Sequence, residues 1–94
     1  MNIDFYKVFE DATTVNYLIE TKSYEKITTG VTKKLVKALC IFDKIEQKIK
    51  FDPEKTDTFF FERINEPLMI EAHLKRFSKK QQGFPDTYNL CTGG

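Results

Sequence analysis

The 94-residue chain contains little of the material from which most catalytic and metal sites are built. It has a single histidine, His73, and only two cysteines, Cys40 and Cys91, whose distance along the chain matches no zinc-ligand spacing. Its four glycines form no phosphate-binding loop, because only the last two are neighbours. We therefore predict no enzyme activity, no bound metal and no cofactor.

Long apolar runs are also missing. No stretch approaches the roughly 18 apolar residues that a membrane-spanning helix needs, and the N-terminus lacks the charged-then-apolar layout of a secretory signal. Two cysteines without a local framework are typical of a reducing compartment rather than of a disulfide scaffold. We expect a soluble, cytoplasmic protein without a membrane span.

Net charge is nearly absent, at +1 from 15 basic and 14 acidic side chains, but the charges are segregated. Residues 31–50 carry six lysines against two acidic residues, whereas residues 51–66 carry five acidic residues against two basic ones. Domains that bind nucleic acid are usually more basic overall. The local excess therefore indicates contact with an acidic partner surface, and no nucleic acid.

Apolar residues make up 40% of the chain, with nine phenylalanines and four tyrosines, which is typical of a folded globule rather than a disordered segment. The length suits one compact core. We expect a single domain over residues 1–94, in which residues 83–94 form a short last strand or a flexible tail.

The stretch 31–50 predicts a long amphipathic helix. Thr28 and Thr29 supply capping hydroxyls at its start, and Pro53 ends it. At 100° per residue the lysines share one side and the apolar residues the other. The lysine side carries no Arg, Asn or Gln that could read bases. The lysines are Lys33, Lys37, Lys44 and Lys48, with Lys34 close by; the apolar residues are Val31, Leu35, Ala38, Leu39, Phe42, Ile45 and Ile49.

Period-two alternation predicts strands on either side of this helix. Residues 3–9 form the first, with Ile3, Phe5, Lys7 and Phe9 on one face. Residues 14–21 form the second, with a short helix as the alternative. Residues 58–64 read as a buried strand, and 87–91 as a last one. Residues 68–77 fit either a strand or a helix that shows one apolar face. The expected core consists of Phe5, Leu35, Leu39, Phe42, Ile45, Phe59 and Phe61.

The predicted order of elements resembles that of the ubiquitin superfold, the β-grasp, with two strands, then a long helix, then further strands. Within it, residues 24–39 resemble the Thr-Thr-led helix start of Ras-association domains and of the first lobe of FERM modules. Residues 59–63 are similar to the aromatic strand that follows in those families, and residues 66–68 resemble their Glu-x-Pro-Leu element, one residue shorter. The expected fold is α+β, a ubiquitin-like β-grasp with a mixed four- or five-stranded sheet and the 31–50 helix packed on one face.

This resemblance implies a non-enzymatic protein-binding module whose partner is a GTP-loaded small GTPase. In these families the second strand pairs edge to edge with a strand of the GTPase. Basic residues of the first two strands and of the helix start face the acidic switch surface. The partner-binding residues carried over to this chain are Lys7, Lys22, Lys33, Lys34 and Lys37.

Two alternatives remain open. Gly93 and Gly94 resemble the tail of ubiquitin-like modifiers and sulfur carriers. Two glycines suit such a tail, because without Cβ they can pass through a narrow active-site channel in extended form. The chain also fits a small inhibitor of the phage or host type, or a dimeric interaction protein. In the dimer, Val36, Cys40 and Ile41 would form the seam. The sequence leaves the partner's identity and the oligomeric state undetermined.

Overall fold

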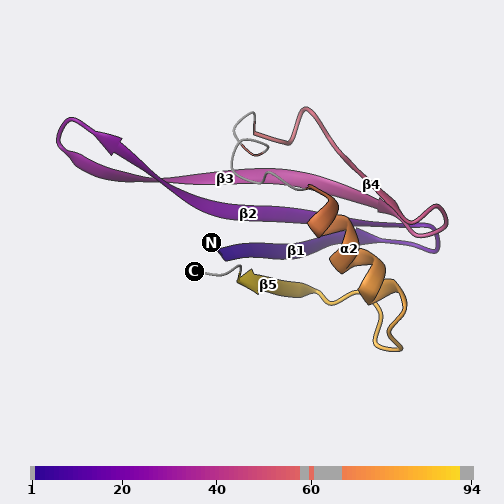
Figure 1. Cartoon of the computed structure of the whole chain (residues 1–94). Helices are drawn as coiled ribbons and strands as arrows, with labels where there is room; N and C mark the ends of the chain where they lie inside the picture. The colour runs from indigo at the N-terminus through magenta and orange to yellow at the C-terminus, as the bar shows by residue number, and fades with distance from the viewer. Residues whose placement is uncertain (1, 58–59, 61–66, 92–94) are drawn as a thin grey trace.

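The computed structural model describes residues 2–57, 60 and 67–91, and of residues 23–27, 31–34 and 67 the backbone alone. Its described strands form one antiparallel sheet in the order β4-β3-β2-β1-β5, and helix α2 crosses one face of that sheet (Figure 1). The elements are β1 (Asn2–Glu10), β2 (Thr14–Ile27), β3 (Gly30–Asp43), β4 (Lys48–Phe51), α2 (Pro67–Ser78) and β5 (Thr87–Cys91).

The predicted helix over residues 31–50 is wrong, because this segment forms β3, a turn at residues 44–47 and β4. β3 pairs with β2 along its whole length, from Thr14 opposite Asp43 to Ile27 opposite Gly30. A continuous apolar run fits a buried strand as well as a helix, and periodicity alone does not separate the two. Pairing with β2 favours the strand, because β2 supplies hydrogen-bond partners for the backbone groups along one edge of β3.

The turns before and after β3 were not predicted from the sequence. Thr28 and Thr29 form the tip of the β2–β3 hairpin instead of capping a helix, and Gly30 follows with a φ of 145°, which residues with a side chain rarely adopt. The β3–β4 turn contains no glycine or proline. The Asp43 carboxylate builds it by accepting hydrogen bonds from two turn amides, at 2.8 and 3.0 Å.

The ubiquitin-like β-grasp is therefore also wrong. The sheet is antiparallel rather than mixed, and α2, a short helix, follows β4 in sequence instead of β2. The strands predicted at residues 3–9, 14–21 and 87–91 are present within β1, β2 and β5. β2, however, lies in the middle of the sheet.

The open choice for residues 68–77 resolves in favour of the helix. α2 begins at Pro67, whose missing N–H is harmless in a first turn. Ile70, Leu74 and Phe77 recur at helical spacing and are buried against the sheet. An ion pair of 3.0 Å joins Glu71 and Lys75.

The core lies between α2 and the sheet. Phe5, Phe42 and Phe60 are fully buried within it. Of the other expected core residues, Leu39 is buried on the opposite face of the sheet, whereas Leu35 and Ile45 are 43% and 73% exposed. The predictions for Phe59 and Phe61, and most of the predicted strand 58–64, lie outside the described residues. Phe60 itself has a helical backbone, and its ring centroid lies 5.3 Å from that of Phe51.

Candidate functional site

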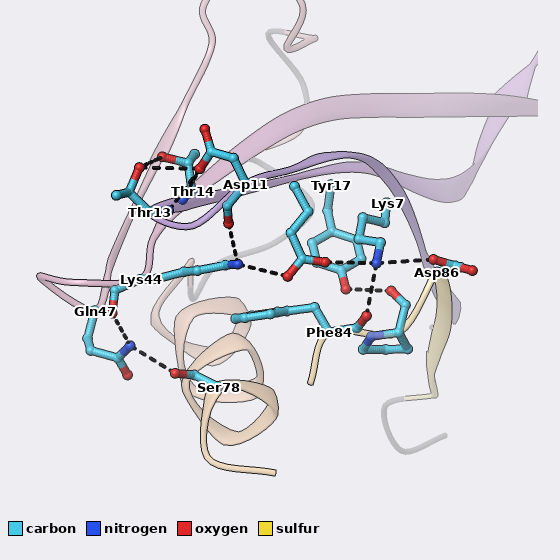
Figure 2. A network of polar contacts seen from close by, with 12 residues as sticks. Lys7, Asp11, Thr13, Thr14, Tyr17, Lys44, Gln47, Ser78, Phe84 and Asp86 are labelled. Carbon is cyan, nitrogen blue, oxygen red and sulfur yellow. Dashed lines mark hydrogen bonds and ion pairs between the residues drawn. The ribbon is translucent and has the colours of Figure 1, made fainter. Parts of the chain in front are cut away.

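A cluster of paired charges lies where the end of β1 meets the loop before β5 (Figure 2). The Lys7 ammonium is 2.9 Å from one Glu10 oxygen, 3.1 Å from an Asp86 oxygen and 3.2 Å from the Phe84 carbonyl oxygen. The other Glu10 oxygen accepts a hydrogen bond of 2.8 Å from Lys44. Hydrogen bonds from Lys44 and Lys7 lower the pKa of Glu10, and those to Glu10 and Asp86 raise the pKa of Lys7. Opposite charges thus favour the ionised forms of Glu10 and Lys7.

The same cluster joins segments that are distant in sequence. Lys44, in the β3–β4 turn, donates to the Asp11 carbonyl oxygen in the β1–β2 turn and lies 5.3 Å from the centroid of the Phe84 ring. The Tyr17 hydroxyl donates to the Pro85 carbonyl oxygen at 2.6 Å. These contacts hold the two turns and the loop after α2 against the sheet. We therefore assign the cluster a structural role.

The groups considered for catalysis are in unfavourable states. Burial raises the pKa of the Cys40 thiol to about 12, so it remains a protonated, weak nucleophile. Burial and the nearby Arg76 lower the pKa of His73, and its Nδ1 is buried without a hydrogen-bond partner. Within residues 2–57, 60 and 67–91, no group of three or more His, Cys, Asp or Glu could hold a metal ion. The two candidate binding sites are exposed surfaces.

The first surface is the sheet face opposite α2, which we call the open face. Two neighbouring rows of the strand register form an apolar band across β3, β2 and β1. Described helices and strands leave this face uncovered, so that Tyr6, Val8 and Phe9 are 39%, 57% and 49% exposed. One row contains Leu39, Leu18 and Tyr6, and the other contains Ile41, Asn16 and Phe9.

A β-bulge in β1 creates part of this band. Lys7 pairs with Tyr17, but the next pair is Phe9 with Asn16, so Val8 is an extra residue in the ladder. The period-two prediction placed Phe9 on the same face as Phe5. The bulge reverses the alternation and turns Phe9 to the open face. Adjacent apolar residues at positions 8 and 9 were the available sequence signal, since an unbulged strand points them to opposite faces.

The band encloses a groove of about 480 Å³. The Asn16 Oδ1 atom in its wall is buried and has no hydrogen-bond partner. An unpaired buried acceptor costs about 1–3 kcal/mol. The groove is therefore mainly apolar, and its polar lining residues are Asn16 and Lys55. Its lining consists of Val8, Phe9, Asn16, Leu18, Leu39 and Lys55.

Charged residues border the band on the next row of the register. Glu20 lies opposite Lys37, and their charged atoms are 3.6 Å apart. Lys22, which is exposed, lies diagonally across from Lys37. These two lysines of the predicted partner-binding set are thus close together on the open face.

The second surface is the end of the β2–β3 hairpin, which we call the arm and define as residues 22–35. β1 stops pairing with β2 at Thr21, and β4 pairs only with residues 40–43 of β3. The arm therefore extends beyond the rest of the sheet and accounts for the long axis of 49 Å (Figure 1). Among the described residues no third strand pairs with it, so both of its backbone edges are free.

The predicted partner-binding residues thus separate into three places. Lys7 lies in the polar cluster, away from the open face, and is held by Glu10 and Asp86. Lys33 and Lys34 belong to the arm, opposite Tyr24 and Ser23. Edge-to-edge pairing is not available to residues 14–21, because β1 and β3 flank them on both sides.

The residues of the two alternative functions are also placed in part. Gly93 and Gly94 lie outside the described residues. The dimer seam predicted from a helix face is wrong, because Val36 and Cys40 are buried in the core, while Ile41 belongs to the open face.

In the part of the chain that the structure describes, no helix is long and apolar enough to cross a membrane. No protein-family model, curated protein sequence or solved structure matches the chain.

Proposed function

We propose that the protein is a non-enzymatic protein-binding module that engages an acidic partner through the arm. The observation that carries this proposal is a two-stranded ribbon that extends past the sheet, with neither backbone edge paired to another described strand. Unpaired strand edges can take up a strand from another protein by β-augmentation. The bound strand gains main-chain hydrogen bonds, and side chains of the arm then select its sequence.

The charge of the arm indicates the chemistry of the partner. It contains four lysines, at positions 22, 26, 33 and 34, against one acidic residue, Glu25. This local charge of +3 exceeds the net charge of the whole chain, which is +1. Opposite charge on a partner would accelerate association, and salt would weaken the effect. The arm therefore favours a strand or surface rich in Asp and Glu.

Nucleic acid is the competing polyanion, since a two-stranded ribbon fits the major groove of DNA. The arm contains no Arg, Asn or Gln, which are the usual base-reading side chains. The near-zero net charge of the chain also opposes non-specific phosphate binding. These features favour a protein partner.

A GTP-loaded small GTPase is the specific partner that the sequence resemblance suggested. That resemblance included a β-grasp sheet with β2 at an accessible edge, and here β2 pairs on both sides up to Thr21. We therefore propose the partner by its chemistry, an acidic protein with an exposed strand edge. Titration of the labelled protein with small GTPases loaded with GTP or GDP tests that specific partner.

The test uses isotope-labelled protein and a short peptide of alternating Glu and Val, with a Lys-Val peptide as the charge control. We expect the acidic peptide to shift the amide resonances of residues 22–35, and salt to weaken its binding. The double variant Lys33→Glu/Lys34→Glu should lose this binding, whereas Lys48→Glu/Lys50→Glu in β4 should retain it. Equal binding of both peptides, shifts outside the arm, or preferential binding of duplex DNA would contradict the proposal.

A further inference from the structure

We propose that the acidic partner strand pairs with the β3 edge of the arm, in line with residues 52–57, and that Asp57 limits its affinity. The β3 edge is the side of β3 that faces away from β2. This inference rests on the proposed function, because it names the edge at which the arm would take up the strand. Just outside the arm, a segment of this chain already pairs with the same edge of β3.

The loop after β4 runs along the β3 edge. The Leu39 carbonyl oxygen accepts a 3.0 Å hydrogen bond from the Asp52 amide, and the Leu39 amide donates to the Thr56 hydroxyl at 3.3 Å. At Lys37 the carbonyl oxygen accepts from the Asp57 amide at 2.8 Å, and the Lys37 amide donates to the Asp57 carboxylate at 2.9 Å. This chain therefore occupies its own β3 edge as far as Lys37.

The same edge continues into the arm with its backbone groups unpaired. In an antiparallel strand the amides and carbonyls of alternate residues point to the same side. The backbone groups of Lys37 and Leu39 point away from β2, and so therefore do those of the odd-numbered residues of the arm. These residues are Val31, Lys33 and Leu35. Among the described residues nothing pairs with this side of them, so they extend the occupied edge as a site for another strand.

The two edges of the arm differ in the side chain at their base. Leu35, on β3, is apolar and yet 43% exposed. Its register partner Lys22, on β2, is charged and suited to water. A strand on the β3 edge would place a residue directly opposite Leu35, where the two side chains can pack. Covering Leu35 removes apolar surface from water, so pairing at this edge is the more favourable. The partner strand should therefore carry an apolar residue at this position among its acidic ones.

Asp57 marks the point at which the chain leaves this edge. Its carbonyl oxygen accepts a 3.0 Å hydrogen bond from the amide of the buried Phe60, so the backbone turns away toward the core. Its carboxylate takes the place of that carbonyl oxygen at the Lys37 amide. A partner strand that extended one pair further would need this amide, and the carboxylate would repel its acidic side chains. Asp57 therefore competes with the partner for one end of the site.

Hydrogen exchange of the isotope-labelled full chain identifies the edge that binds. We expect the Glu-Val peptide, at about ten times its dissociation constant, to slow exchange of the amides on the β3 edge about 10-fold. The amides of the arm that point outward on the β2 edge should exchange as before. The first set is Val31, Lys33 and Leu35, and the second is Lys22, Tyr24 and Lys26. Protection of the second set instead would overturn the inference and leave the proposed function intact, whereas the absence of any peptide binding at the arm would overturn both.

Substitution of Asp57 tests its competition with the partner. Asp57→Ala frees the Lys37 amide and should tighten binding of the Glu-Val peptide about 5-fold, which corresponds to one net hydrogen bond. Glu54→Ala is the matched control, because it removes the same charge from an exposed residue of the same loop. It should change the affinity less than about 2-fold. No gain in a folded Asp57→Ala, or an equal gain in Glu54→Ala, would overturn the role of Asp57. The exchange measurement on the wild type decides the edge even where Asp57→Ala unfolds the chain.

Discussion

The hydroxyl of Tyr17 donates a 2.6 Å hydrogen bond to the carbonyl oxygen of Pro85, a residue 68 positions later in the chain. This bond connects the central strand of the sheet to the loop between α2 and β5. It acts together with the ion pair of Lys7 and Asp86 in the same loop. The two contacts hold that loop at one end of the sheet and help to keep α2 on the core face, which leaves the opposite face accessible.

Removing the hydroxyl tests the energetic role of this contact. Tyr17→Phe keeps the buried ring but leaves the Pro85 carbonyl oxygen without its donor. We expect it to lower the free energy of unfolding by about 1 kcal/mol, measured by urea denaturation. Tyr6→Phe, on the 39% exposed side chain of the open face, is the matched control and should have almost no effect. Equal losses in the two variants would contradict the assigned role.

The paired carboxylate of Glu10 predicts a loss of stability in acid. Its pKa is lowered from 4.5 by Lys44 and Lys7, so the unfolded chain takes up a proton at higher pH than the folded one. The stabilisation is therefore complete above pH 4.5 and lost as the pH falls through the lowered pKa of the folded state. Urea midpoints between pH 7 and 3 should show a shallower decline for Glu10→Gln than for the wild type. Parallel curves would mean that the pairing contributes nothing.

The stability losses caused by truncating two apolar residues within 31–50 distinguish the observed strand from the predicted helix. The predicted helix placed both Phe42 and Ile45 in the core, whereas the structure buries Phe42 and leaves Ile45 73% exposed in a turn. Phe42→Ala should therefore cost about 3–5 kcal/mol, and Ile45→Ala less than about 0.5 kcal/mol. Thermal denaturation of the two variants provides the comparison. Similar large losses would favour the helix.

The buried thiol of Cys40 predicts weaker stability in mild alkali. An ordinary thiol pKa of 9.0 applies to the unfolded chain, but burial raises the pKa of Cys40 to about 12 in the folded state. Above pH 9 the unfolded state releases a proton that the folded state keeps, so the free energy of unfolding should decrease as the pH rises. Denaturation between pH 8 and 10 should show this slope, and Cys40→Ala should reduce it. Cys91→Ala, at the exposed cysteine, is the matched control for removing a sulfur atom.

The environment of Asn16 predicts that an apolar substitution there increases stability. Its buried Oδ1 has no partner, so replacing it with an apolar side chain of similar size removes a desolvation cost. Asn16→Leu should therefore raise the free energy of unfolding by about 1 kcal/mol. Urea denaturation of the variant and the wild type at equal protein concentration provides the comparison. A destabilised Asn16→Leu would show that the groove wall has no room for the added methyl groups.

The candidate sites were only partly visible in the sequence. Lysine enrichment identified Lys33 and Lys34, which belong to the arm, because charge segregation can be read without a fold. The family resemblance added Lys7, which the fold pairs with Glu10 and Asp86. The apolar band was missed because it depends on the bulge at Val8 and on which strands become neighbours. Register is a property of pairing between distant segments.

Several elements could be predicted from the sequence, because their residue pattern fits one structure or a choice of two. Alternation predicted the strands within β1, β2 and β5, with a short helix as the alternative for residues 14–21 and a flexible tail as the alternative for residues 83–94. Helical spacing of Ile70, Leu74 and Phe77 was one of two options for residues 68–77. The secondary structure of residues 31–50 could not be predicted without the fold, because their apolar run fits both a helix and a strand. Pairing of Thr14–Ile27 with this segment made it a strand, since a strand satisfies its backbone through a neighbour and a helix satisfies its own. The same choice moved the lysines from a helix face to a hairpin arm and a sheet face.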